Sequence, residues 1–199
     1  MPCKVVLEPV RSADTLGEAV TQAERAEAAR LAPPARRDEY LTWRAVVRRC
    51  LGCGVGISYD AVGAPTVDIP DIYISVAHSA GMTAVAIDSG RCGVDIEALD
   101  RDFSKGVRRI LSARELSLSG SDHWPAAAWC AKEAMYKYYG RRGVDMAREM
   151  VLDSVDPEVH RIEAHMQGED SCTVLIHRTG GYIVAAISRN YTEIVVPAE

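Results

Sequence analysis

The chain has 199 residues, a formal net charge of −5 and a pI of about 5.6, so bulk attraction to nucleic acid or to an anionic membrane is not expected. Its hydrophobic content of 48% is ordinary for a globular protein, and its length is enough for one large domain or two small ones. No apolar run approaches the length of a membrane span, and the first residues lack the basic-then-apolar pattern of a secretory signal.

The N-terminal part predicts one strand and two helices. The apolar run 5–7 favours a strand, and residues 16–32 are rich in Ala and Glu with helical periodicity. Pro33 and Pro34 end that helix, and a second helix is expected from about residue 36 to residue 51. The second helix carries five arginines, which form either a solvated basic face or a phosphate-binding one: Arg36, Arg37, Arg44, Arg48 and Arg49.

Six cysteines are scattered along the chain, and a protein of this length needs no disulfide framework. We therefore expect free thiols and a cytoplasmic location. Cys50 and Cys53 form a CxxC pair, but a structural zinc site needs two further ligands at a suitable spacing, and no second CxxC is present. A metal or redox role is accordingly not expected for this pair.

Short apolar strands are expected next, at 55–59, 72–77, 82–87 and 93–97. The last of these reads Gly-Val-Asp-Ile-Glu and is apolar apart from its two acids. Because residues two apart on a strand point to the same side, Asp95 and Glu97 share one face of the strand, and Val94 and Ile96 share the other.

The polar segment 100–102 is a candidate boundary between two halves. Helical segments are expected at about 104–111 and 113–118, and Ser112 with Glu115 matches the S-x-x-E capping box. This pattern is the structural alternative to a catalytic role for Glu115, and the sequence leaves both open. A longer helix is expected from about Pro125 to Tyr139, and strands are expected at 150–155, 161–166, 171–176 and 182–188.

The long helix carries Trp129, Glu133 and Lys137 on one face, because they are spaced at i, i+4 and i+8. If this face meets the strand 93–97, three carboxylates and one ammonium group converge. Packed acids repel one another unless a cation lies among them, and carboxylate oxygens with water and phosphate are typical ligands of Mg²⁺. The alternative is a solvated strand face beside a weak surface ion pair.

Four segments in this order resemble the 4′-phosphopantetheinyl transferases of the Sfp type. Gly93–Glu97, followed by Trp129-x-x-Lys-Glu-Ala-x-x-Lys137, is similar to the paired motif of that family. Arg109–Leu116 is similar to its Arg-x-hydrophobic-Ser-x-x-Glu segment, and Ile74–Ser79 to a strand that ends in Ser-His-Ser. The resemblance covers roughly residues 70–140.

The resemblance implies an α+β fold in which two similar halves, each a helix with an antiparallel sheet, are related by a pseudo-twofold axis. Residues 1–99 would form the half that grips coenzyme A and supplies the first metal carboxylates. Residues 100–199 would supply the third carboxylate and the phosphate-binding lysine, and the active site would lie at the junction of the halves.

The resemblance also implies an activity, namely Mg²⁺-dependent transfer of the 4′-phosphopantetheine arm of coenzyme A to a serine of an apo acyl or peptidyl carrier protein. The product would be 3′,5′-adenosine bisphosphate, and Mn²⁺ could replace Mg²⁺. Carrier proteins serve fatty acid, polyketide or nonribosomal peptide biosynthesis, and the sequence does not choose among them. The enzymes of this type are generally monomers, which implies a monomer here.

The resemblance assigns roles to individual residues. Asp95, Glu97 and Glu133 would bind the metal ion, and Lys137 and His78 would contact the phosphates of coenzyme A. Either Glu133 or Glu115 would accept the proton of the attacking serine. Arginines of the helix 36–51, with Arg37 and Arg44 as first choices, would bind the 3′-phosphate, for which bidentate arginine is suited. A basic surface for the acidic carrier protein would comprise Arg101, Arg108, Arg109, Arg141 and Arg142.

Two departures from the family pattern leave alternatives open. The turn 63–65 reads Gly-Ala-Pro where the family has Gly-Lys-Pro, and Ala77 replaces the first serine of Ser-His-Ser. The alternatives are a non-catalytic relative that binds coenzyme A or carrier proteins, and another Mg²⁺-dependent phosphate enzyme such as a nuclease. The low basicity of the chain argues against the nuclease.

Overall fold

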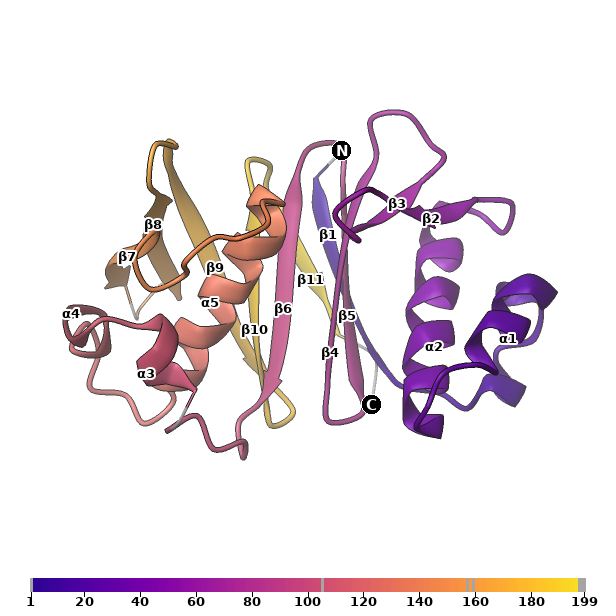
Figure 1. The fold of residues 1–199 in the computed structure, drawn as a ribbon, viewed down its shortest axis with the longest axis horizontal. Coiled ribbons are helices and arrows are strands. Elements are labelled where there is room, and N and C mark those ends of the chain that lie inside the picture. The colour runs from indigo at the N-terminus through magenta and orange to yellow at the C-terminus, as the bar shows by residue number, and fades with distance from the viewer. Residues whose placement is uncertain (1, 105, 157, 159, 197–199) are drawn as a thin grey trace.

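The structure is a computed structural model and describes residues 2–104, 106–156, 158 and 160–196. The fold is mixed α+β (Figure 1). The strands are β1 (Cys3–Pro9), β2 (Ile57–Tyr59), β3 (Pro65–Val67), β4 (Tyr73–Ser79), β5 (Met82–Asp88), β6 (Cys92–Ala98), β7 (Met150–Asp156), β8 (Arg161–Met166), β9 (Ser171–Thr179), β10 (Tyr182–Ser188) and β11 (Thr192–Val195). The helices are α1 (Gln22–Ala28), α2 (Pro34–Leu51), α3 (Val107–Ile110), α4 (Ala113–Leu116) and α5 (Trp124–Tyr139), with 3-10 turns η1 (Ala13–Thr15) and η2 (Gly17–Ala19).

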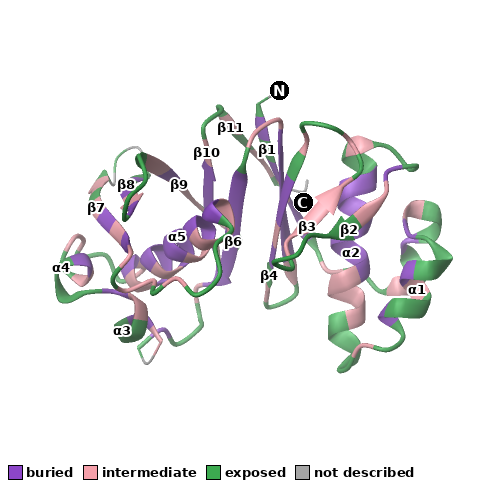
Figure 2. Ribbon diagram, turned by 45° about the horizontal axis from the view of Figure 1, so that its top comes forward, coloured by how far each residue is buried: buried purple, intermediate pink, exposed green. Residues whose placement is uncertain are grey.

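The described strands form one sheet of order β11-β1-β5-β4 and another of order β6-β10-β9-β8-β7, beside the short β2–β3 hairpin. We call them the first and the second sheet. They pack face to face through small and β-branched side chains, α2 covers the outer face of the first sheet, and α5 covers that of the second. The layers therefore run helix, sheet, sheet, helix, and buried residues concentrate where the sheets and α5 meet (Figure 2).

The sequence of β5 shows why this layering holds. Ala84 and Ala86 face the second sheet, while Val85 and Ile87 face α2, so both faces of the strand are covered. A strand covered on both sides is mostly apolar, which is the pattern of residues 84–87.

Strand β6 lies at the edge of the second sheet and pairs with β10. Its outer edge faces β4, where serine hydroxyls accept from its backbone: Val94 N–H donates to Ser75 Oγ at 3.1 Å, and Ala98 N–H donates to Ser79 Oγ at 3.3 Å. Val94 and Ile96 point into the core between the sheets, as their alternation with the acids predicts. The strand that carries the two acids therefore lies at the junction of the sheets.

Gly93 lets α5 approach this strand closely. A Cβ atom at this position would lie less than 3.0 Å from the Ala134 carbonyl oxygen and from the Ile187 side chain. The absence of a side chain at Gly93 thus sets the distance between the acids of β6 and the helix that carries Glu133.

Replacing Gly93 by alanine is therefore expected to lower the free energy of unfolding by about 1–3 kcal/mol, because the methyl group overpacks a helix backbone that cannot move aside cheaply. Urea denaturation measures the change. Gly120→Ala is the matched control, since no described atom lies within 4 Å of its Cβ position, and we expect a change within about 0.5 kcal/mol. Equal stabilities of the two variants would contradict the close approach.

The two sheets exchange strands along the chain. β6 precedes residue 100 but belongs to the second sheet, and β11 comes from the C-terminal end but pairs in parallel with β1 of the first sheet. A division of the chain into 1–99 and 100–199 therefore stays a prediction about domains, and the sheets do not follow it. The pseudo-twofold relation likewise stays a prediction.

The observed elements differ from the sequence predictions in three places. Residues 16–32 form only η2 and the short helix α1, where the sequence predicts one long helix. The segment between the predicted strands 55–59 and 72–77 holds an additional strand, β3. The sequence predicts no strand after residue 188, and the structure adds β11 there. Among the described helices, none is long and apolar enough to cross a membrane.

Candidate active site

Asp95 and Glu97 of β6 lie on the side of α5, which carries Glu133 and Lys137, and we call these three carboxylates the acid cluster. Asp95 is buried, and its Oδ1 lies 2.8 Å from Lys137 Nζ, which also donates to the Val94 carbonyl oxygen at 2.9 Å. Cys130 of α5 contacts the other oxygen, with its thiol 3.2 Å from Asp95 Oδ2. Burial, followed by the Asp95 charge, raises the pKa of this thiol, so it stays protonated and donates. Asp95 is thus fixed by groups from one face of α5.

Glu97 is also buried and is held from the opposite side. Its Oε2 accepts from Ser79 Oγ of β4 at 2.9 Å, and its Oε1 pairs with Arg101, which lies one turn beyond the strand. Because β4 belongs to the first sheet and β6 to the second, Ser79 connects the acid cluster to the other sheet.

Glu133 completes the cluster electrostatically. Its side chain is partly buried, and within the described part of the chain no hydrogen bond or ion pair holds it. Burial raises the pKa of the Glu133 carboxyl, and the charges of Asp95 and Glu97 raise it further, against the opposing effects of Lys137 and Arg101. The three acids therefore act on one another across the β6–α5 contact.

Chemically, this donor set fits a hard divalent cation, because it is composed of carboxylates and one of them has no cationic partner of its own. As they are placed, however, no three His, Cys, Asp or Glu side chains of the described residues are grouped closely enough to hold a metal ion. Lys137 and Arg101 instead neutralise Asp95 and Glu97. Metal binding by Asp95, Glu97 and Glu133 remains a prediction, and it requires these two cations to turn away from the acids.

The raised pKa of Glu133 predicts that this side chain costs stability at neutral pH. A carboxyl whose pKa is higher in the folded than in the unfolded state stabilises the fold when protonated and loses that contribution as pH rises. Glu133→Gln is therefore expected to raise the thermal midpoint at pH 7.5 without divalent cations, and the gain should shrink as the pH falls. Thermal unfolding of the parent and the variant, at pH 7.5 and at an acidic pH, measures this difference in midpoint. A variant less stable than the parent at pH 7.5 would contradict the prediction.

His78 does not join the acids. Its ring lies at the exposed side of β4, with Nδ1 3.4 Å from Glu39 Oε2 of α2. Ser79 points to β6, and because neighbouring side chains of a strand point to opposite faces, His78 points away from the acid cluster. A role of His78 toward a phosphate stays a prediction.

Glu115 lies in a separate buried network. It forms the predicted capping box with Ser112, accepts from Leu152 N–H at 2.9 Å, and pairs with the fully buried Lys132 at 2.8 Å. Although burial raises the pKa of the Glu115 carboxyl, hydrogen bonds from Lys132, Leu152 and Ser112 outweigh it and hold the pKa below its usual range. The structure therefore assigns this residue to the support of α4, α5 and β7, and no contact places it with the acid cluster.

Lys132, the first of the two lysines in the motif, has a structural role. Its Nζ donates to the carbonyl oxygens of Ile110 at 2.7 Å and Met146 at 2.9 Å as well as to Glu115. Helices α3 and α4 and the loop before β7 thus meet at this ammonium group of α5.

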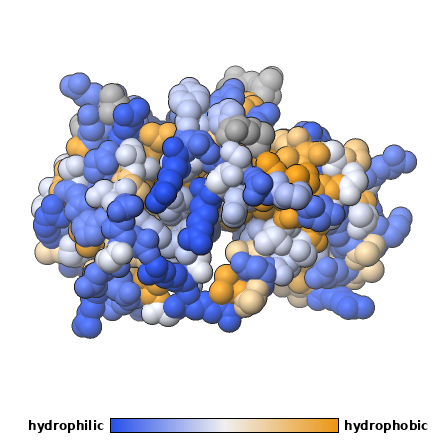
Figure 3. Space-filling view, turned by 90° about the horizontal axis from the view of Figure 1, so that it is seen from above, coloured by the Kyte–Doolittle hydropathy of each residue, from blue (hydrophilic) through white to orange (hydrophobic). Residues whose placement is uncertain are grey.

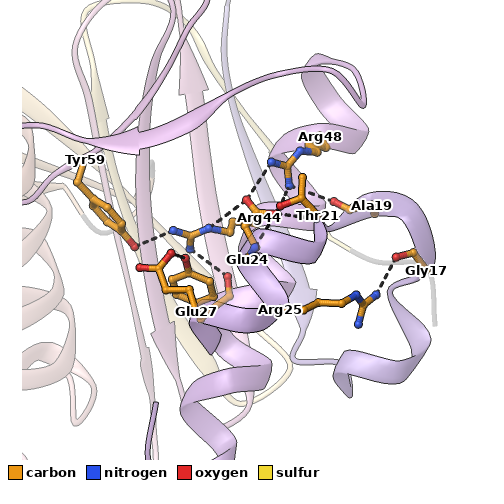
Figure 4. A network of polar contacts seen from close by, with 10 residues as sticks. Gly17, Ala19, Thr21, Glu24, Arg25, Glu27, Arg44, Arg48 and Tyr59 are labelled. Carbon is orange, nitrogen blue, oxygen red and sulfur yellow. Dashed lines mark hydrogen bonds and ion pairs between the residues drawn. The ribbon is translucent and has the colours of Figure 1, made fainter. Parts of the chain in front are cut away.

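The five arginines of α2 do not share one face: Arg44 and Arg48 are buried, whereas Arg36 and Arg49 are exposed. Arg44 is buried, with its guanidinium 3.4 Å from the Tyr40 ring centroid and its terminal nitrogen 3.1 Å from Tyr59 Oη. Arg48 forms a bidentate pair with Glu24, at 2.7 and 2.9 Å (Figure 4). Arg44 thus lies among aromatic rings and beside Glu24, and its role toward the 3′-phosphate stays a prediction. Arg37 is partly exposed and donates to the Leu31 carbonyl oxygen at 2.7 Å.

Two adjoining cavities lie beside Lys137. One of about 240 Å³ is bounded by residues 62–65 after β2, by residues 74–76 of β4 and by the end of α5. The other, of about 420 Å³, shares Ala64, Ile74 and Lys137 with it. Seen from above, the outline of the molecule is notched near its middle (Figure 3). The turn 63–65 and the lysine of the motif therefore border the same space.

Residues 91–187 match the family model described as the 4′-phosphopantetheinyl transferase superfamily. The matched segment covers just under half of the chain. It begins directly before β6 and ends in β10, so it contains Asp95, Glu97, Glu133 and Lys137. The match supports a transferase of phosphopantetheine in general terms. No curated protein matches the chain.

Sequence reasoning missed several residues that touch the acids, namely Cys130, Arg101 as a partner of Glu97, and Ser79 as a direct contact. Cys130 lies next to Ala131 in the motif helix, and three residues before Glu133, so helical spacing would have placed it on the strand-facing side. Arg101 lies four residues after Glu97, yet no regular element joins the two in the sequence pattern.

Proposed function

We propose that this chain is a 4′-phosphopantetheinyl transferase of the Sfp type, which transfers the phosphopantetheine arm of coenzyme A to a serine of an apo carrier protein. The observation that carries the proposal is the electrostatic coupling of Glu133 to Asp95 and Glu97 across the β6–α5 contact, beside Lys137, which also lines the adjoining cavities. A protein that only binds its partners has no use for a cluster of mutually repelling acids.

In this proposal, Asp95, Glu97 and Glu133 would hold Mg²⁺, or Mn²⁺ in its place, and the ion would supply Lewis-acid polarisation of the phosphate and charge neutralisation of the leaving group. Lys137 is the residue best placed to meet the pyrophosphate, because its ammonium group contacts the acid cluster and also lines both cavities. A lysine ammonium meets phosphate oxygens as a point charge.

Glu133 is our candidate for the general base. In the reaction, the serine hydroxyl of the carrier protein attacks the β-phosphorus of coenzyme A, its proton passes to a carboxylate, and 3′,5′-adenosine bisphosphate leaves. A base must be free to accept, and Glu133 has no partner among the described residues, whereas Glu115 is held by Lys132 and three further donors. The raised pKa of Glu133 also brings it closer to neutral pH, where a general base is most effective.

The carrier protein would dock on a basic surface near the junction. Of the five arginines considered for it, Arg108 and Arg109 of α3 are exposed, while Arg101 is paired with Glu97. We propose α3 as the docking element and a monomer as the working form.

The test is incubation of the protein with coenzyme A, Mg²⁺ and a panel of apo carrier proteins, followed by intact mass measurement. The proposed function requires the phosphopantetheine increment on at least one carrier protein, and chelation of the metal should abolish it. Binding of coenzyme A without any increment would indicate the non-catalytic relative. Cleavage of a nucleic acid, with no carrier modified, would indicate a nuclease.

A further inference from the structure

The side chain of Arg101 acts on two members of the acid cluster. Its half-exposed guanidinium pairs with Oε1 of the buried Glu97. Burial raises the pKa of the Glu133 carboxyl, and the charge of Arg101 is among the effects that oppose this rise. One cationic side chain therefore offsets part of the repulsion among the three acids.

Two aromatic rings hold this guanidinium in place. Its central carbon lies 5.1 Å from the ring centroid of Phe103 and 5.1 Å from that of Trp129. The indole is itself fixed, because it packs on Gly106, where a Cβ atom would lie 2.9 Å from it. A cation within about 6 Å of a ring centroid is attracted by the electrons of the ring. The rings would thus keep Arg101 nearby even when its ion pair with Glu97 is open.

Both carboxylate oxygens of Glu97 have a partner. Oε2 accepts from Ser79 Oγ at 2.9 Å, and Oε1 is paired with Arg101. A neutral hydroxyl can stay beside a metal-bound carboxylate, whereas a guanidinium on the same carboxylate repels a second cation. Arg101 also differs from Lys137, because it lines neither of the two cavities beside that lysine. Its contacts with the site are therefore with the acid cluster alone.

We infer that Arg101 takes the place of the divalent cation at Glu97 in the metal-free protein, and that its displacement sets the affinity of the acid cluster for the metal ion. The inference rests on the proposed function and deepens it by naming what regulates the metal site. Arg101 is a positioning residue, since it acts through Glu97. On metal binding, its guanidinium would leave Glu97 Oε1 and stay over the rings of Phe103 and Trp129.

Binding of Mn²⁺, measured from the electron paramagnetic resonance of the free ion, tests this inference without coenzyme A and without transfer. Arg101→Gln removes the competing charge, so we expect it to bind Mn²⁺ about two- to fivefold more tightly than the parent, the range of an exposed ion pair. Arg101→Lys keeps a cation beside Glu97 and should stay closer to the parent. Arg148→Gln removes an equal charge from an exposed arginine that pairs with Asp145, and should leave the affinity unchanged.

Thermal unfolding separates this role from a structural one. Without divalent cations, Arg101→Gln should have a lower thermal midpoint than the parent, because the acids then repel one another with less counter-charge. Saturating Mn²⁺ should raise the midpoint of the variant by more than it raises that of the parent. A variant that had only lost structure at the site would bind the ion more weakly.

Equal or weaker binding of Mn²⁺ by Arg101→Gln overturns the inference, and so does the absence of binding by both proteins. An equal gain in Arg148→Gln also overturns it, because net charge alone would then explain the effect. The outcome is separable from that of the proposed function. Tighter binding by Arg101→Gln, in a protein that modifies no carrier, would keep the role of Arg101 and reject the transferase. Transfer by a protein whose Mn²⁺ affinity is independent of Arg101 would do the reverse.

Discussion

Asp95→Ala is expected to abolish transfer of phosphopantetheine to a carrier protein while the protein stays folded. Asp95 lies at the centre of the site, because its two oxygens contact Lys137 and Cys130 and its charge acts on Glu133. Its removal takes away one proposed metal ligand and frees Lys137 from its position between the acids and the cavities. Loss of one such electrostatic group typically lowers kcat by about 100- to 1000-fold. The carrier protein's mass increment, followed over time, measures the rate.

Two further variants separate chemistry from folding. Asp95→Asn keeps the shape of the side chain and an oxygen that accepts from Lys137, so we expect a normal thermal midpoint with the same loss of activity. Glu163→Ala removes an exposed carboxylate from β8 of the same sheet and should retain full activity. Full activity in Asp95→Ala would defeat the proposed function.

Glu24→Ala is expected to cause the largest loss of stability among the changes considered. The Glu24 carboxylate pairs with Arg48 at 2.7 Å, lies 3.3 Å from Arg44 Nε and accepts from Thr21 N–H at 2.8 Å. Both arginines are buried, so the variant leaves two guanidinium groups without a counter-charge (Figure 4). Breaking a buried ion pair from one side costs about 3–5 kcal/mol. For a chain of this length, this lowers the thermal midpoint by roughly 10 °C.

The pH dependence gives a second measurement of the same pair. Although burial raises the pKa of Glu24, hydrogen bonds from Arg48 and Thr21 outweigh it and lower the pKa below the usual value. A carboxyl with a lowered pKa stabilises the fold above its unfolded-state pKa and loses this contribution as pH falls through the folded-state value. The difference in thermal midpoint between the parent protein and Glu24→Ala should therefore become smaller in acid.

Glu27→Ala is the matched control for this network. It removes an exposed carboxylate from the same helix, one that accepts a hydrogen bond from Tyr40. We expect a loss below about 1 kcal/mol, as for other exposed groups. Equal stability of Glu24→Ala and Glu27→Ala would contradict the prediction that the buried ion pairs stabilise the packing of α1 on α2.

The acid cluster could be predicted because its spacing is local. A strand places residues two apart on one side, and a helix does the same for residues four apart, so the pairs Asp95 with Glu97 and Glu133 with Lys137 follow from the sequence alone. The alternation also predicts that Val94 and Ile96 enter the core. Most strands and the long helices were predictable for the same reason.

Long-range partners could not be predicted in this way. Whether an arginine of α2 is exposed depends on Glu24, which lies 24 residues before Arg48 and has no pattern linking it to the helix. The strand β11 is short, and its partner β1 lies at the opposite end of the chain. The side of β4 to which His78 points depends on which face meets β6, and this is a property of the assembled sheets.

The strand exchange between the sheets limits where the chain can be cut or recombined. A cut after residue 99 would leave β6 on the first fragment and β11 on the second, so each piece would carry a strand that completes the sheet of the other. Replacing either piece by its counterpart from a relative would therefore pair strands of different origin in both sheets. A chimera that keeps both sheets intact would have to move β11 together with β1, and β6 together with β10.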